Sequence, residues 1–170
     1  MQLEPSAAML LPLTNALTTT AQQQAASPLL GRELLKTLVD VMPMLDGAAL
    51  YELAAEAALY RTHSGSGFND NAIRQLAFSA YPAVAAAFVD SAVVTLPAGE
   101  GLLAVFPFNI GEADIHATNA LLAYLPDADD LAPEVETALT VAIRLFALAL
   151  NQQQTLITAQ AVLDAPDPET

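Results

Sequence analysis

The last third of the chain carries a long apolar repeat that constrains the fold more than any other feature of the sequence. From Val135 onward, residues recur at alternating spacings of four and three. This is the heptad spacing of helices that pack against a partner along their length. It predicts a helix of about 30 residues and roughly 45 Å, longer than a domain of this size needs for its own core. The seam consists of Val135, Leu139, Ala142, Phe146, Ala149, Gln153, Leu156, Gln160 and Leu163.

A second apolar stripe lies beside this seam and contains Val141, Leu145, Leu148 and Ala149. Because the helix is apolar over more than one face, it needs two partners. We expect one face to pack on the domain's own sheet and the other to meet a second copy of the chain in a homodimer. A helix buried within one monomer is the alternative. The residues predicted to form the dimer interface are Val135, Leu139, Ala142, Phe146, Ala149, Leu156 and Leu163.

The charge of the chain excludes two classes of partner. The formal net charge is −14, which repels the phosphates of nucleic acids and the headgroups of anionic membranes. The five basic residues are also scattered along the sequence, at Arg32, Lys36, Arg61, Arg74 and Arg144, and so predict no basic stripe. At 170 residues with 54% hydrophobic content, the chain is expected to fold as one domain with helical extensions.

The absence of cysteine excludes disulfides, thiolate nucleophiles and Cys-ligated metals. The N-terminal segment lacks the basic start of a signal peptide. The apolar run 138–150 contains Arg144 and is shorter than the roughly 20 residues of a membrane span. We therefore expect a cytoplasmic module that makes no membrane contact and carries no cofactor.

Periodicity and turn signals predict the order of the remaining elements. A β-hairpin is expected around Tyr51 and Tyr60, although a helix through both residues competes with it. The long C-terminal helix is expected to begin near Glu134. The other predicted elements are helices over 6–26 and 29–45, hairpin strands 48–53 and 57–63, short helices over 71–79 and 82–89, and a meander of strands 92–96, 102–109 and 115–125.

This element order resembles a GAF domain over residues 29–154. The segment GAALYELAAEAALYRTHSG is similar to the first hairpin of that family, and EGLLAVFPFNIGEADIHATNALLAYL is similar to its central strand, turn and following strand. The resemblance implies an α+β fold with a central antiparallel sheet of five to six strands. Long N- and C-terminal helices would pack on one face, with a ligand cavity on the other. A PAS-like sheet is the alternative, but two long helices on one side favour GAF.

The resemblance also implies a domain organisation and a role. Residues 1–28 would form a helical extension, residues 29–154 the sensor domain, and residues 155–170 a connector helix and tail. GAF domains commonly act as dimeric input modules, so the chain is expected to pass a ligand or conformational signal to an attached output domain. Asp167, Pro168 and Thr170 resemble the start of a GGDEF diguanylate cyclase domain, which would place the chain in bacterial cyclic di-GMP signalling.

Six residues are predicted to line the ligand cavity of the resembled fold. Two are polar and lie on the second strand, and the others concentrate the aromatic content of the segment that would enclose the cavity. For the aromatic residues ordinary core packing is the alternative, and for the histidine a solvated loop position. The ligand is unknown, since the chain lacks the cyclic-nucleotide pattern and the bilin-bearing cysteine of some family members. The six are Arg61, His63, Phe78, Tyr81, Phe88 and Phe106.

No pattern predicts catalytic residues or a metal site. His63 and His116 are far apart and belong to no metal-binding spacing, and neither a GxSxG nor an SxxK motif occurs. Asp129 and Asp130 precede a helix, where capping explains them. Two alternatives to a sensor stay open. One is a ligand-free dimerisation or docking scaffold of the same fold, and the other is a small hydrolase or transferase with two carboxylates, or a histidine beside a carboxylate, in its pocket.

Overall fold

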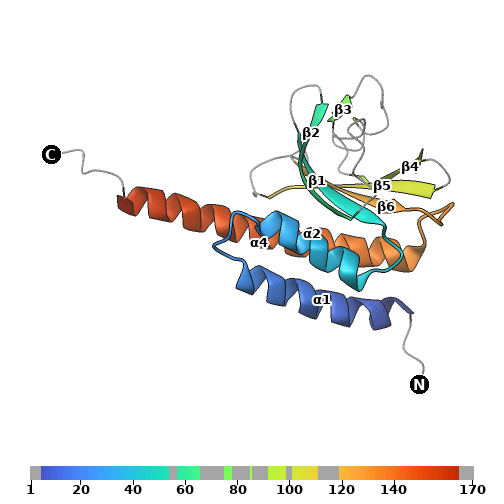
Figure 1. Ribbon diagram of the computed structural model, residues 1–170, viewed down its shortest axis with the longest axis horizontal. Helices are drawn as coiled ribbons and strands as arrows, with labels where there is room; N and C mark the ends of the chain where they lie inside the picture. Colours follow the sequence, from blue (N-terminus) through green and yellow to red (C-terminus); the bar gives the residue numbers. More distant parts are fainter. Residues whose placement is uncertain are drawn as a thin grey trace.

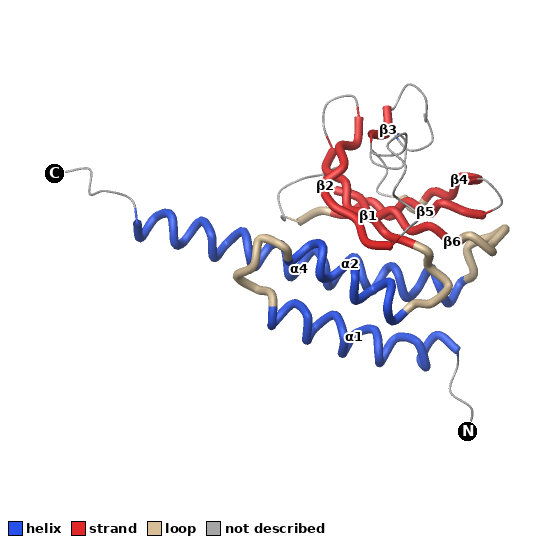
Figure 2. The backbone as a smooth tube through the Cα atoms, in the orientation of Figure 1, coloured by secondary structure: helices blue, strands red, loops and turns tan. Residues whose placement is uncertain are grey.

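The computed structural model describes residues 5–53, 57–65, 75–77, 85, 92–98, 101–110 and 119–164. Within these ranges three helices cover one face of an antiparallel sheet (Figure 1). The α2 and α4 helices lie directly against the sheet, and α1 packs on both of them as an outer layer (Figure 2). The predicted α+β fold, with five to six strands and the long helices on one face, is therefore confirmed. The elements are α1 (Pro5–Gln23), α2 (Leu30–Val41), β1 (Gly47–Leu53), β2 (Ala57–Gly65), β3 (Gln75–Ala77), β4 (Val94–Ala98), β5 (Gly101–Phe108), β6 (Asn119–Leu125) and α4 (Pro133–Asp164).

The sheet places sequentially distant strands side by side. Its order is β3-β2-β1-β6-β5-β4, so the predicted hairpin and the predicted meander are both present and join where β1 pairs with β6. Every residue of β5 is buried. This explains why that strand is continuously apolar in sequence, because a central strand with both faces covered has no polar side to alternate.

Side chains of the sheet alternate between two buried faces. Phe106 and Leu121 belong to the core cluster formed with the helices. Val105 and Leu122, which alternate with them, are also fully buried and lie on the opposite face. From α1, Leu13 and Leu17 enter the helix-side cluster, so α1 packs into the same core as the rest of the domain.

Two predicted helices differ from those observed. The α2 helix ends at Val41 rather than near residue 45, because Met42 precedes Pro43 and a residue before proline is disfavoured in the helical region. The helix predicted over 71–79 is wrong at residues 75–77, which form β3 and pair with the edge of β2. Long-range pairing overrides local periodicity in such a short segment. The other residues of 71–79, and those of 82–89 except the helical Ala85, lie outside the described residues.

The α4 helix requires a correction to the predicted dimer seam. Five of the seven residues assigned to the interface are buried in the core of a single chain: Val135, Leu139, Ala142, Phe146 and Ala149. They pack against α1, α2 and β5, so contacts within a single chain already bury them. Of the seven, Leu156 and Leu163 are exposed, at 56% and 79%. The C-terminal turns of α4 extend beyond the other helices and the sheet (Figure 1).

Candidate ligand pocket

A cavity of about 410 Å³ opens on the helix side of the sheet, where the first turn of α2 meets β1, β2 and α4. Its volume lies within the range of about 300–1,000 Å³ usual for small-molecule sites. The family resemblance implied a cavity on the opposite face of the sheet, so this pocket is a different site. Its lining consists of Pro28, Leu29, Gly31, Arg32, Leu50, Glu52, Arg61, Thr62, Phe108, Ile110, Asn119, Leu150 and Gln153.

Two basic residues and one acidic residue determine the charge of the pocket. Arg61 on β2 forms an ion pair with Glu52 on the neighbouring strand β1, and both side chains are substantially exposed, at 61% and 45%. Arg32 reaches the same pocket from the first turn of α2. The three charges leave a local net charge of about +1 in a chain whose total is −14.

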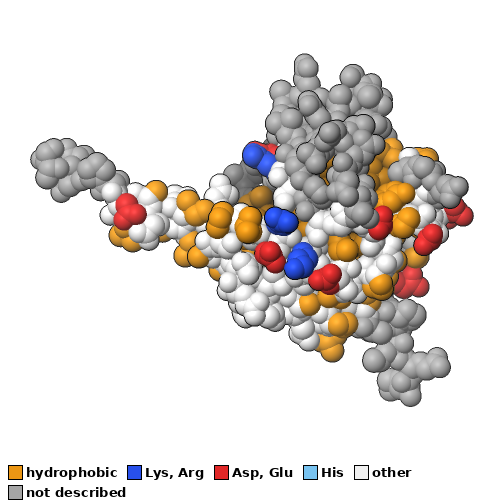
Figure 3. Space-filling model, in the orientation of Figure 1, with side chains coloured by type: hydrophobic (Ala, Val, Ile, Leu, Met, Phe, Trp, Pro, Cys, Tyr) orange, Lys and Arg blue, Asp and Glu red, His pale blue; other side chains and the backbone are white. Residues whose placement is uncertain are grey.

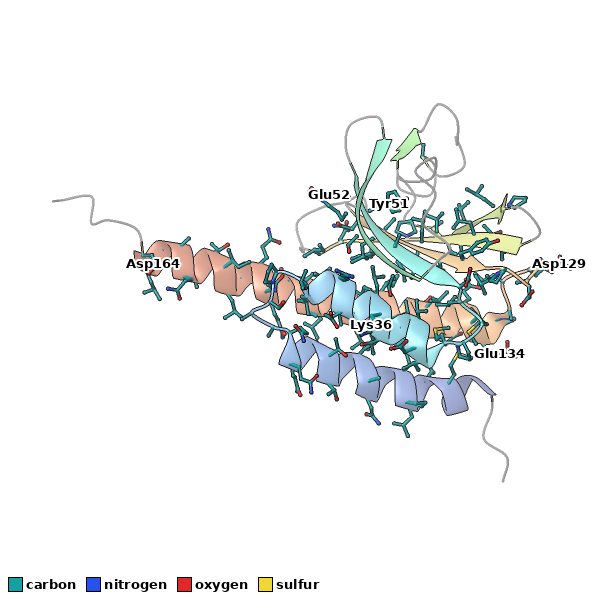
Figure 4. The ribbon with its side chains drawn as sticks, viewed as in Figure 1. Lys36, Tyr51, Glu52, Asp129, Glu134 and Asp164 are labelled. Atoms are coloured by element: carbon teal, nitrogen blue, oxygen red, sulfur yellow. The ribbon has the colours of Figure 1, made fainter. Side chains whose placement is uncertain are left out.

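Basic residues that are scattered in the sequence are therefore neighbours in the fold. Arg32 also lines a second hollow beside the pocket, together with Glu33, Lys36, Asp40 and the end of β2. Figure 3 shows Lys and Arg side chains on this face. In Figure 4, Lys36 lies farther along α2 than the helix end below Glu52. Three of the five basic residues of the chain thus lie on one face, which their sequence positions did not predict.

A β-bulge explains why Arg61 faces the helices. Leu50 is opposite Thr62 and Tyr51 is opposite Tyr60, so Arg61 is the extra residue on β2 with no position opposite it on β1. A bulge interrupts the strict alternation of side chains and lets the extra residue point the same way as its neighbour. Arg61 and Thr62 accordingly both line the pocket.

The structure brings few of the predicted ligand residues together. Arg61 lines this pocket, whereas Phe106 is fully buried in the helix-side core and does not line it, which corrects its assignment. Core packing explains Phe106, because β5 is buried along its whole length. His63 lies in β2 opposite Ala49, and its side chain is outside the described residues. The remaining three, Phe78, Tyr81 and Phe88, lie outside the described residues.

Sequence reasoning missed the polar residue that joins the pocket to the helices. Gln153 lies in the apolar seam of α4, and its side-chain amide donates to the carbonyl oxygens of Ala25 and Ser27, at 3.1 and 2.5 Å. These carbonyls belong to the turn between α1 and α2. A glutamine inside a mostly apolar heptad seam was the one available signal, since a polar residue at such a position usually has a specific partner.

We expect Gln153→Ala to lower the free energy of unfolding by about 1–2 kcal/mol, because two carbonyls lose their side-chain donor. Gln154→Ala is the matched control, since Gln154 is exposed on the next position of the same helix and should change stability by less than about 0.5 kcal/mol. Urea unfolding followed by circular dichroism measures both. Equal stability of the two variants would contradict the anchoring role of Gln153.

A second cavity of about 440 Å³ lies between α1 and α4. Leu17 and Ala21 form its α1 side, and Leu145, Leu148 and Gln152 form much of its α4 side. The α4 residues belong to the second apolar stripe of the helix rather than to the buried seam. Leu148 is 55% exposed there.

No helix in the described part of the chain is long and apolar enough to span a membrane. Among the same residues, no three His, Cys, Asp or Glu side chains come close enough together to hold a metal ion. The pocket beside α2 has Glu52 as its sole described carboxylate and no described histidine.

Solved structures with the same fold include GAF domains and free methionine-R-sulfoxide reductases. A structure described as a GAF sensor protein from Burkholderia vietnamiensis has a TM-score of 0.69 at 11% identity, covering 91% of this chain and 96% of its own. The GAF domain of an Acinetobacter phosphoenolpyruvate-protein phosphotransferase has a TM-score of 0.58 at 16% identity, with coverage of 90% and 96%. Free methionine-R-sulfoxide reductase from Neisseria meningitidis has a TM-score of 0.66 at 10% identity, with coverage of 92% and 96%.

These similarities establish that the chain has a GAF-like fold. No protein-family model matches the sequence, and no curated protein matches it either. At 10–16% identity the structural neighbours define the fold alone, because one fold hosts several functions.

Proposed function

We propose that this chain is a sensory or regulatory domain that forms a homodimer along α4 and passes a conformational signal through that helix to an output domain. The observation that carries the proposal is the division of α4 into two parts. Its N-terminal half is built into the core, and its C-terminal half leaves the domain with large apolar side chains exposed. A helix anchored in this way transmits changes in domain packing along its axis.

The second stripe of α4 supports pairing with another copy. Val141, Leu145, Leu148, Gln152, Thr155, Ala159 and Val162 follow the same alternation of four and three as the buried seam. Leu148 and Val162 are 55% and 71% exposed. Val141 and Leu145 are partly buried, and the stripe is exposed from Leu148 onward. An exposed heptad stripe is typical of a parallel two-helix contact. The five seam residues that are buried in the core of one chain have no part in this interface.

A regulatory role fits this chain better than the enzymatic activity of one structural neighbour. Thiol-based reduction of a sulfoxide needs a cysteine that can be oxidised, and the sequence contains none. The open, partly charged pocket beside α2 also favours a ligand-responsive domain over the ligand-free scaffold, whose cavity would be filled by small side chains.

The proposed output is a catalytic domain attached after α4. The resemblance of Asp167, Pro168 and Thr170 to the start of a diguanylate cyclase suggests that cyclic di-GMP synthesis is the regulated reaction. Those three residues lie outside the described residues, so the support comes from the sequence pattern and from the direction in which α4 extends.

Leu148→Gln is expected to weaken dimerisation at least about tenfold, because a leucine buried between two helices contributes roughly 1.5–3 kcal/mol. Ile157→Gln is the matched control. Ile157 is 63% exposed and lies on the opposite side of the same helix, given about 3.6 residues per turn. Sedimentation velocity over a concentration series measures the effect. A wild-type chain that stays monomeric at high micromolar concentration, or two variants that dimerise equally, would refute the proposed interface.

A further inference from the structure

We propose that the pocket beside α2 binds a small amphipathic carboxylate, a monoanion with a short apolar chain. The inference deepens the proposed sensory function by naming a ligand class and a site for it, and it rests on that function only for its biological meaning. Binding itself depends on the pocket and not on the dimer.

The charge of the pocket selects a monoanion. Arg32 and Arg61 supply two positive charges, and Glu52 neutralises one of them, so one unit of positive charge is left for a ligand. A carboxylate balances that unit and can accept paired hydrogen bonds from a guanidinium group. A dianionic phosphate monoester would leave excess negative charge in a chain that already carries −14.

The apolar wall of the pocket selects the rest of the ligand. It is built from residues of three elements and two connecting segments, and it belongs to the same cavity as the charged groups. A short aliphatic or aromatic group would be removed from water there, while its carboxylate stays at the charged side. The wall consists of Leu29, Leu50, Phe108, Ile110 and Leu150.

The backbone of α2 adds to the anion preference of this site. Gly31 and Arg32 line the pocket and belong to the first turn of a 12-residue helix, whose N-cap residue Leu29 makes no side-chain capping bond. The N-terminal end of a helix carries partial positive charge and favours an anion. Gly31 also keeps the pocket open, since a Cβ there would lie 3.2 Å from Leu50 Cδ1.

The pocket is placed where a ligand can influence the connector helix. Leu150 and Gln153 of α4 line it, and Gln153 donates to the carbonyls of the turn that leads into α2. A ligand held between Arg32 and Leu150 would therefore contact both sides of this junction. The ligand would favour the packing in which α4 is anchored to the α1–α2 turn. A regulatory ligand must bind one conformation better than another, and these contacts would supply that difference.

The test is a titration of the ¹⁵N-labelled full chain, followed by amide chemical shifts, with sodium hexanoate as the probe. Sodium acetate keeps the charge without the chain, and 1-hexanol keeps the chain without the charge. We expect saturable shifts at Gly31, Arg32 and Thr62 with hexanoate, and at least about tenfold weaker effects with either control compound, because both parts of the pocket are needed. Shifts of equal size with hexanol would overturn the proposal.

Two variants test whether hexanoate binds at the charged groups of the pocket. Arg32→Gln should weaken hexanoate binding about tenfold, since it removes the unpaired guanidinium from the pocket. Lys36→Gln is the matched control, because Lys36 lies one turn farther along α2 and outside the pocket lining, and it should leave the affinity unchanged. Equal affinity of both variants, or shifts confined to the α1–α4 groove around Leu148, would refute the site. Neither result alters the dimerisation measurement, so failure of this inference is distinguishable from failure of the proposed function.

Discussion

Phe146→Ala is expected to lower the free energy of unfolding by about 3–5 kcal/mol. Phe146 is fully buried on α4, in the cluster that joins all three described helices to the sheet. Removal of its ring would leave a cavity that the surrounding backbone cannot fill by small shifts. Since a domain of this kind is stable by about 5–15 kcal/mol in total, the loss would leave a large part of the population unfolded on mild heating.

The matched control for this substitution is Ile157→Ala on the same helix. Ile157 is 63% exposed, so the change should cost less than about 0.5 kcal/mol. Urea unfolding at two protein concentrations measures both variants and also separates core from interface. A core residue gives a loss that is independent of protein concentration, whereas a dimer-interface residue gives a loss that depends on it. Concentration dependence for Phe146→Ala would restore the interface assignment that the structure overturns.

Gly65→Ala is expected to lower the free energy of unfolding by about 2–4 kcal/mol. Gly65 ends β2 with a φ of +88°, a conformation that residues with a Cβ rarely adopt. An added Cβ would also lie 2.5 Å from the carbonyl oxygen of Asp46 and 2.7 Å from the Cα of Gly47. Both contacts are with backbone, so the β1–β2 pair would have to shift.

Gly31→Ala provides the control, because it adds the same methyl group without the backbone strain. Its Cβ would meet the end of the flexible Leu50 side chain at 3.2 Å, and alanine favours a helix over glycine by about 0.5–1 kcal/mol. The net change in stability should stay within about 1 kcal/mol. Thermal and urea unfolding of both variants test the comparison, and a Gly65→Ala protein as stable as the wild type would show that the end of β2 can rearrange freely.

Most elements could be predicted because their signals are local. Leu30, Leu34 and Leu38 share one face of α2, and short apolar runs define β1 and β6. The errors arise where distant residues decide. Residues 75–77 have helical spacing but form β3, because the edge of β2 offers a hydrogen-bonded partner.

The assignment of the two stripes on α4 is a similar case. Both stripes have heptad spacing, so the pattern alone could not tell which one faces the domain's own core. The structure buries the stripe that contains Phe146 as far as Ala149 and leaves Leu148 and Val162 of the other stripe exposed. The choice follows from the packing of α1, α2 and β5, which contact the same side of α4.

The candidate site was less predictable than the fold. Arg61 was identified as a possible ligand residue, but its direction depends on the bulge between β1 and β2, and no local pattern marks that bulge. Arg32 and Glu52 reach the same pocket from different elements. Their convergence is a property of the assembled sheet and helices.

By itself, the sequence determined which chemistry the chain cannot perform and which helices and strands it forms. A chain without cysteine cannot perform thiol chemistry, and the periods of its apolar residues reflect the geometry of individual helices and strands. Only the tertiary structure decided which apolar stripe enters the core, where three basic residues gather, and which glutamine anchors the long helix. The physical reason is that these features depend on contacts between residues distant in the chain, whose free energies no local pattern contains.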